Sequence, residues 1–271
     1  MTEHRQAADL GDVQSTLFIP LTARARETQR KHPALRDPKA VEVLDSVEFD
    51  AAMYSKGWNG WVTVPRTVIY DNWVREFLGK NPLGTVVELG TGLNTRFERT
   101  DNGTVRWIDL DLPDVIELRR RFFADTDRRR MIAASLTSEE WLQPVAQFPA
   151  PYFFVAEGVM AYLSADDVAA TLTGITTRFP GAFVAFDTCS QRVYDMQHKQ
   201  AARKGMAARW AWACDDPKTL ERYGLRLLET TTFTSPPPAV RRELPARYRY
   251  LLPLANTVFG KTFALNLFQA L

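Results

Sequence analysis

Short apolar runs alternate with amphipathic stretches along the chain. Each run holds a few consecutive apolar or β-branched residues between polar, glycine or proline residues. Runs of this length favour buried strands over helices. They predict five strands, at residues 85–89, 105–110, 131–134, 152–156 and 182–186. Two later strands are predicted at residues 225–233 and 262–269; the second alternates cleanly, with Phe263, Leu265 and Leu267 on one face.

Helical periodicity fills the intervals between these strands. It predicts helices near residues 16–27, 37–44, 65–78, 112–123, 164–175 and 244–259. Pro65 is expected at the first helical position, after a loop at 53–61, and Thr137 to Glu140 is expected to form a capping box that starts a further helix. Residues 190–214 are helical in tendency, and Pro236 to Pro238 are expected to form a stiff surface spacer. The alternation of strand and helix predicts a parallel α/β sheet with right-handed crossovers.

The first predicted strand ends at two glycines. Gly90-Thr91-Gly92 follows it directly, and glycine lets the backbone turn sharply and approach a ligand. About twenty residues later the second strand ends at Asp111, the spacing at which an acid binds a ribose in a nucleotide-binding βαβ unit. Asp111 could instead cap the next helix. Asp109 is the rival acid, two residues earlier on the same strand.

The third glycine of the dinucleotide fingerprint is absent, because Thr95 stands at its place. That glycine serves a pyrophosphate and close helix packing, so its loss argues against NAD or FAD. Glu88, two residues before the first glycine, completes an E-x-G-x-G pattern. Ligands of parallel sheets bind beyond the carboxyl ends of the strands. A single site is predicted there because six residues fall at such ends: Glu88, Gly90, Asp111, Ser135, Glu157 and Asp187.

Five segments in order resemble the leucine carboxyl methyltransferase family, which uses S-adenosylmethionine. They read VVELGTGLNTR, IDLDLPDVIELRRRFF, SLTSEEW, FFVAEGVMAYLS and FPGAFVAFD. The resemblance covers about residues 22–187 and is nearer to bacterial members, among them methyltransferases of aromatic polyketide pathways, than to the eukaryotic enzyme that methylates a protein's C-terminal leucine. It implies a Rossmann-like class I fold: a mostly parallel seven-stranded sheet with a last antiparallel strand.

The resemblance also implies an organisation within one methyltransferase domain, residues 1–271. A helical lid or extension at 1–64 would precede the cofactor-binding core at 65–189. A substrate-side insertion at 190–214 and the C-terminal part of the sheet at 215–271 would follow. The N-terminal section could equally be a packing helix pair, and both roles can hold at once.

Several site residues are implied by matching the family's motifs. Arg66 matches the family's cofactor-carboxylate arginine; Arg24 is a second candidate, with Arg26 as its alternative. Ser135 and Leu136 match the adenine-contacting step, and Glu157 matches a glutamate that faces the cofactor. The full cofactor-binding set expected is Arg24, Arg66, Glu88, Gly90, Gly92, Asp111, Leu112, Ser135, Leu136 and Glu157.

On the acceptor side, Tyr162 and His198 are the candidate catalytic residues. The resemblance predicts transfer of methyl from S-adenosylmethionine, leaving S-adenosylhomocysteine, to a carboxylate of a small, aromatic, polyketide-type substrate. Two alternatives stay open: a phenol O-methyltransferase that uses His198 or an acid as base, and a catalytically silent cofactor-binding scaffold. Arg192, Arg203 or Tyr162 could hold the acceptor carboxylate.

Composition removes other classes of function. The 34 basic and 32 acidic residues leave a net charge of +2, so nucleic acid or a membrane is not expected as a partner. Arginines at 119–121 and 128–130 are expected on solvated faces. The two cysteines lack zinc-ligand spacing, so no metal is expected. The N-terminus lacks a signal peptide's apolar core, which predicts a cytoplasmic protein; an oligomer is possible.

Overall fold

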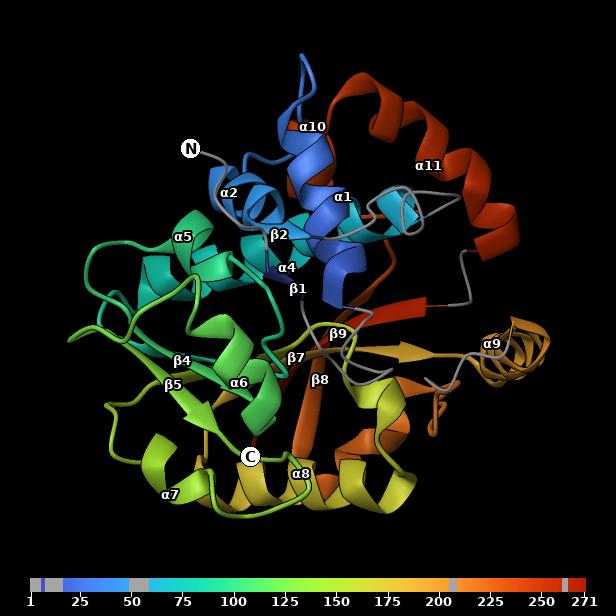
Figure 1. The fold of residues 1–271 in the computed structure, drawn as a ribbon. Helices are drawn as coiled ribbons and strands as arrows, with labels where there is room; N and C mark the ends of the chain where they lie inside the picture. Colours follow the sequence, from blue (N-terminus) through green and yellow to red (C-terminus); the bar gives the residue numbers. More distant parts are fainter. Residues whose placement is uncertain (1–5, 8–16, 49–58, 205–208, 260–262) are drawn as a thin grey trace, which may run out of the picture.

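A computed structural model describes residues 6–7, 17–48, 59–204, 209–259 and 263–271. Its seven-stranded sheet has the order β5-β4-β3-β6-β7-β9-β8 (Figure 1). The strands are β3 (Thr85–Leu89), β4 (Arg106–Asp111), β5 (Arg129–Ala133), β6 (Tyr152–Ala156), β7 (Phe183–Cys189), β8 (Leu225–Thr231) and β9 (Phe263–Ala270). A separate two-stranded sheet pairs β1 (Gln6–Ala7) with β2 (Val47–Glu48).

The sheet confirms the predicted fold class. β3 to β7 pair in parallel, whereas β9 pairs antiparallel with both β7 and β8. β8 therefore points the same way as β3 to β7, and β9 is the one reversed strand of this sheet. The carboxyl ends of six strands consequently lie at one edge, which we call the carboxyl edge, where such sheets bind ligands.

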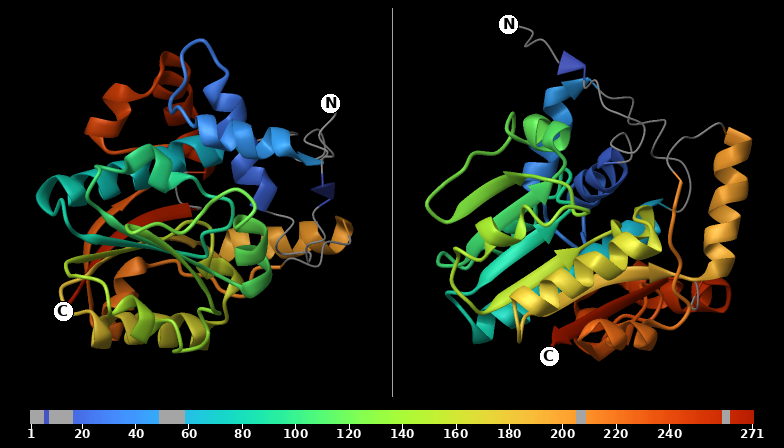
Figure 2. Two further views of the ribbon diagram at one scale, coloured as in Figure 1. Left: turned by 60° about the vertical axis from the view of Figure 1, so that its left-hand side comes forward. Right: turned by 90° about the horizontal axis from the view of Figure 1, so that it is seen from below.

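Helices cover both faces of the sheet (Figures 1 and 2). Before and between the first five sheet strands lie α1 (Phe18–Thr28), α2 (Pro38–Ser46), α4 (Asn59–Lys80), α5 (Arg96–Thr100), α6 (Pro113–Arg119), α7 (Leu142–Val145), η2 (Met160–Tyr162) and α8 (Ala165–Arg178). After β7 come α9 (Gln191–Lys204), η3 (Pro217–Tyr223), α10 (Pro238–Glu243) and α11 (Ala246–Phe259).

Alternate residues of each central strand enter different hydrophobic clusters. Val87 and Phe154 pack with α7, α8 and η3, while Val86 and Phe153 pack with α4, α10 and α11. Both faces of the sheet are thus buried, which explains why these strands read as continuous apolar runs rather than as polar–apolar alternation.

The N-terminal helices α1 and α2 are part of the core. Their apolar residues form a third cluster with Leu93, Ile116 of α6 and Met131 of β5. Asp37 caps α2, accepting a hydrogen bond from the backbone N–H of Ala40 at 2.9 Å, as its position before Pro38 predicts. This packing brings α1 against the turn after β3.

Four local predictions were wrong. Pro65 lies inside α4, which begins at Asn59, so residues 59–61 are helical; the rest of the expected loop lies outside the described residues. Thr137 to Glu140 does not cap a helix, because the turn there delays α7 to Leu142. Pro238 starts α10 instead of continuing a spacer. In the segment after β7, residues 191–204 are helical as expected, but residues 209–214 run as irregular chain.

Among the helices that the structure describes, none combines the length with the apolar composition needed to cross a bilayer.

Candidate cofactor site

The turn after β3 is the centre of the carboxyl edge. We call residues 90–95 the glycine loop. Gly90 and Gly92 have positive φ angles of 62° and 51°, a conformation that residues with a Cβ rarely adopt. Both are also closely approached: a Cβ on Gly90 would lie 2.6 Å from a methyl of Val159, and one on Gly92 would lie 2.8 Å from a methyl of Leu17. Only glycine therefore fits at either position.

Asp111 and Asp109 of β4 have different surroundings. Asp111 is partly exposed, and its two carboxylate oxygens accept hydrogen bonds from the backbone N–H groups of Gly92 at 2.6 Å and Leu112 at 2.8 Å. Each oxygen keeps a further lone pair for a ligand hydroxyl. Asp109 is buried and pairs with Arg119 at 3.0 Å and Arg129 at 2.6 Å. Asp111 is therefore the one with acceptor capacity left over, and it does not cap α6, whose cap residue is Leu112.

Arg119 and Arg129 correct the expectation of solvated arginine faces. They are 1% and 4% exposed, respectively. The Arg119 guanidinium also donates to the backbone carbonyl of Gly92 at 2.8 Å. Gly92 is thus held at its N–H by Asp111 of β4 and at its carbonyl by Arg119 of α6. These two contacts fix the glycine loop.

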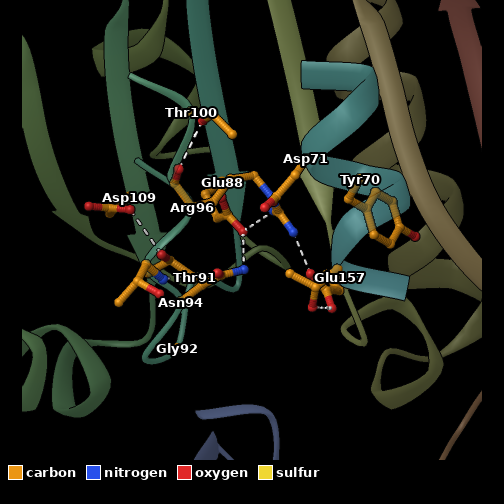
Figure 3. A network of polar contacts seen from close by, with 12 residues as sticks. Tyr70, Asp71, Glu88, Thr91, Gly92, Asn94, Arg96, Thr100, Asp109 and Glu157 are labelled. Carbon is orange, nitrogen blue, oxygen red and sulfur yellow. Dashed lines mark hydrogen bonds and ion pairs between the residues drawn. The ribbon is translucent and has the colours of Figure 1, made fainter. Parts of the chain in front are cut away.

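Arg96 lies at the centre of a buried network of charged residues (Figure 3). Its Nε donates to Asp71 at 2.9 Å, one Nη pairs with Glu88 and the other with Glu157. Glu88 ends β3 and Glu157 follows β6, the neighbouring strand. Asn94 of the glycine loop also donates to Glu88, at 2.8 Å. One guanidinium therefore joins two strand ends to α4.

Arg66, on the same helix as Asp71, reaches the other side of Glu157. Its Nε donates to Glu157 at 3.0 Å, and Thr67 donates to the same carboxylate oxygen at 2.9 Å. A second nitrogen of Arg66 lies 3.8 Å from Asp187, which also accepts from the backbone N–H of Gly158 at 2.6 Å. The Arg66 side chain remains 15% exposed, unlike that of Arg96, which is fully buried.

Arg24 lies farther back than expected for a ligand-binding residue. It is 1% exposed, pairs with Asp37 at 2.9 Å and donates to the backbone carbonyl of Leu93 in the glycine loop at 2.9 Å. Asp37 in turn pairs with Arg99 at 2.8 Å, and Arg99 pairs with Asp71 at 2.7 Å. The N-terminal helices are therefore connected to the Arg96 network through ion pairs.

Ser135, Leu136 and Leu112 lie on the β5 side of Asp111. The backbone N–H of Ala134 donates to the Asp111 carbonyl at 2.9 Å, which brings the β5 end beside Asp111. The Leu136 carbonyl accepts from Thr171 at 3.2 Å, and its side chain is buried. Leu112 is 37% exposed, unusual for a leucine next to a buried strand. Leu112 therefore offers an apolar surface next to Asp111.

Tyr162 and His198 come from elements joined by residues 209–214. The carbonyl of Ala161 accepts from the backbone N–H of Ala211 at 2.7 Å, and the carbonyl of Trp210 lies 2.6 Å from Nε2 of His198. Because a carbonyl only accepts, Nε2 must carry the proton and Nδ1 is the basic atom of a neutral His198. The His198 ring lies 4.3 Å from that of Tyr194. Residues 209–214 thus connect η2, which holds Tyr162, with α9, which holds His198, and we call these three segments together the wall.

Burial shapes the charge of the site. It raises the pKa of Glu88 to about 7 and that of Asp111 to about 6, and it raises the pKa of Asp187. Although burial acts in the same direction on Glu157, the neighbouring guanidinium groups of Arg66 and Arg96 lower its pKa overall. Burial therefore disfavours the charged forms of Glu88, Asp111 and Asp187, so a cationic ligand that restores their charge would be favoured there.

The sequence analysis did not identify Arg96 or Asp71. Asp71 carried a usable signal, because it stands on the apolar stripe of α4 with Val64, Val74 and Leu78, and a charged residue on a buried stripe requires a partner. Arg96 follows the glycine loop directly, but its partners lie on three other elements. No local pattern identifies such contacts.

The described residues fit S-adenosylmethionine. This cofactor is a cation with a ribose and an adenine, and the site combines several carboxylates, a half-buried acid with free lone pairs and an exposed leucine. Gly90 and Gly92 add no side chains of their own to this turn. Within the described part of the chain, no cluster of three or more histidines, cysteines and acids could hold a metal ion.

The sequence of the chain is similar to a known family and to individual known proteins. The family model for leucine carboxyl methyltransferase matches residues 18–176, more than half of the chain. The tetracenomycin polyketide synthesis O-methyltransferase TcmP of Streptomyces glaucescens is 33% identical over 84% of this chain and 86% of its own. The S-adenosyl-L-methionine-dependent methyltransferase dpfgK of Gibberella zeae is 27% identical over 81% of this chain and 82% of its own.

Among solved structures, a DUF574 family protein from Streptomyces avermitilis superposes with a TM-score of 0.56 at 14% identity, covering 92% of this chain and 97% of its own. That likeness supports the fold alone. The family match and the two relatives support the activity, methyl transfer from S-adenosylmethionine. The chain therefore belongs to the leucine carboxyl methyltransferase family of S-adenosylmethionine-dependent enzymes.

Proposed function

We propose that the chain is an O-methyltransferase that converts a carboxylate of a small, aromatic, polyketide-type molecule to its methyl ester. The choice of acceptor rests on the ion pairs of Glu157, a carboxylate at the carboxyl edge that could otherwise act as a general base. Glu157 is held ionised by Arg66 and Arg96, which makes its carboxylate a weak base. An acceptor carboxylate has a pKa of about 4, so it is already ionised at neutral pH and needs no base.

In this proposal the cofactor lies along the carboxyl edge from β5 to β7. Asp111 accepts from the ribose hydroxyls, and Leu112, Ser135 and Leu136 surround the adenine. Arg66, whose guanidinium is partly exposed, binds the amino-acid carboxylate. Arg24 supports the glycine loop through Leu93 rather than binding the cofactor itself.

When bound, S-adenosylmethionine supplies a methyl group on a positively charged sulfur. The chain's own contribution is to hold the acceptor in line with that group in a dry pocket, and orientation of this kind can supply up to about 7–11 kcal/mol. Tyr162, in η2, would donate a hydrogen bond to the acceptor. Arg192 and Arg203 remain alternatives; the side chain of Arg203 lies outside the described residues.

A phenol acceptor is the second candidate, and one observation favours it. The Trp210 carbonyl fixes the Nε2–H form of His198, which leaves Nδ1 able to accept a phenol proton. Asp187, whose pKa is raised by burial, is the other candidate base.

A matched pair of acceptors separates the two functions. The enzyme is incubated with methyl-labelled cofactor and either 2-naphthoic acid or 2-naphthol, which differ only in the reacting group. We expect label on the acid that leaves as methanol in mild alkali, because esters hydrolyse and aryl ethers do not. Alkali-stable label on naphthol, lost in His198→Ala, would establish the phenol function instead. Absence of product from any acceptor, with cofactor binding intact, would indicate a scaffold.

A further inference from the structure

We propose that Arg96 is a positioning residue of this enzyme: it fixes the Glu88 and Glu157 carboxylates at the floor of the cofactor site without touching the cofactor itself. This inference rests on the proposed location of the cofactor at the carboxyl edge.

The geometry of Arg96 is the first support. Its three nitrogens each bind a different carboxylate, those of Asp71, Glu88 and Glu157 (Figure 3). The side chain is fully buried, and its guanidinium lies 5.5 Å from the centre of the Tyr70 ring. A planar guanidinium can satisfy three acids in fixed directions, which an ammonium group cannot.

The position of the acids is the second support. Glu88 and Glu157 lie at the ends of adjacent central strands, on either side of the turn that begins the glycine loop. Glu157 also binds Arg66, the proposed partner of the cofactor carboxylate. A displaced Glu157 would therefore displace Arg66, so Arg96 influences the cofactor through both residues.

The surrounding charges show why no neighbour can replace Arg96. Glu88 faces Asp109 and Arg119 as well as Arg96 and Glu157. Glu157 faces Arg66, Arg24 and Asp71. Without Arg96, three buried acids would lie together, and at least one would take up a proton. The cofactor, a cation, would then meet a less negative and less ordered site.

The test measures the affinity of S-adenosylmethionine and S-adenosylhomocysteine for Arg96→Lys and Arg96→Met by calorimetry, with unfolding curves alongside. We expect at least a tenfold loss of affinity in Arg96→Met and a smaller loss in Arg96→Lys. As pH is lowered, both proteins should lose affinity because their acids take up protons. In Arg96→Met this loss should begin at a pH about one unit or more above that of the wild type. Wild-type affinity with an unchanged pH profile in a folded Arg96 variant would overturn the proposal.

A second variant addresses folding. Asp71→Asn combined with Arg96→Met removes one acid that is not assigned to the cofactor together with the guanidinium, and it should recover much of the thermal stability. A purely structural role predicts that affinity recovers as well, whereas a positioning role predicts that it stays at least tenfold low. Arg99→Met is the comparison variant: Arg99 lies one turn along the chain, its side chain is 3% exposed, and it binds Asp71, Asp37, Asn94 and Thr95, but not Glu88 or Glu157. It should lose stability and keep more of its affinity than Arg96→Met does.

Failure of the underlying site assignment would look different. If Glu157→Gln and Asp111→Ala both bind S-adenosylmethionine like the wild type, the cofactor does not lie at this edge. If those variants lose affinity and Arg96→Met does not, the site stands and the role of Arg96 is refuted.

Discussion

The two sides of the carboxyl edge are built differently. On the cofactor side, buried side chains bind one another, and Arg96, Glu88, Glu157 and Asp71 form one network. On the side proposed for the acceptor, the segments of the wall are joined by hydrogen bonds to backbone carbonyls, those of Ala161 and Trp210. A network of side chains fixes the identity of every member, because each buried charge needs its partner. A wall held by the backbone lets its side chains change, so the first side suits a constant cofactor and the second a variable substrate.

The largest effect is expected deep on the cofactor side, at Asp109. Asp109→Asn leaves Arg119 and Arg129 buried with a weakened partner, and breaking a buried pair costs about 3–5 kcal/mol. Urea unfolding should show this loss. Glu117→Gln, an exposed acid on α6, is the control and should change little. A loss as small as that of the control would mean that Asp109 does not hold the framework.

Asp111, two residues along the same strand, should affect binding more than stability. Asp111→Ala is expected to weaken S-adenosylmethionine by about 1.5–3 kcal/mol, the range for hydrogen bonds to a charged group. Calorimetry would measure this loss, with Asp114→Asn on the next helix as the control. Wild-type affinity in Asp111→Ala would reject the ribose assignment.

Arg66 tests the partly exposed cation of the cofactor side. Arg66→Met should weaken S-adenosylmethionine and S-adenosylhomocysteine alike, by about 1.5 kcal/mol or more, since both keep the carboxylate that Arg66 is proposed to bind. Arg75→Met, exposed on the same helix, should bind both normally. Unchanged affinity for both ligands would remove Arg66 from the site.

The pH dependence should separate stability from binding. Glu88 has a folded-state pKa of about 7 against an ordinary 4.5, so the folded protein binds this proton more tightly than the unfolded chain. Stability from this group is therefore fully present below pH 4.5 and is lost as pH rises to about 7. Cofactor affinity should run the opposite way, rising by up to about tenfold per pH unit towards pH 7, because a cation favours ionised Glu88 and Asp111.

Two measurements check this pair of trends. Urea unfolding at pH 5 and pH 8 should show the fall in stability, and Glu88→Gln should remove it. Calorimetry in buffers of different ionisation enthalpy near pH 6.5 should detect proton release when the cofactor binds. Proton uptake would contradict the assignment of these acids to the site.

The smallest effect on the cofactor is expected from the acceptor side. His198→Ala should leave S-adenosylmethionine affinity unchanged, within about twofold, because the ring contacts Tyr194 and the Trp210 carbonyl. Turnover of an acid acceptor should persist. A loss of cofactor affinity would show that the wall and the cofactor site act as one unit.

The same contrast decides what the sequence could predict. Strand runs such as Tyr152–Ala156 are local, and they predicted the sheet correctly; the spacing from the glycine turn to Asp111 is local too, and Gly92 and Asp111 do meet through a hydrogen bond. Pro65 misled because tertiary packing carries α4 through a residue that normally starts helices. Arg119 and Arg129 misled because charge runs are usually solvated, and only the fold brings Asp109 between them.

The place of β9 in the sheet also bears on how the chain acquires its structure. β8 is made before β9, yet among the described residues of the seven-stranded sheet β9 is the strand that pairs with it. During synthesis β8 must therefore wait with unpaired backbone groups until β9 arrives, while β3 to β7 can already pair. An unpaired strand invites pairing with other chains. The interval between the two strands is thus the stage at which a growing chain is most exposed to misassembly.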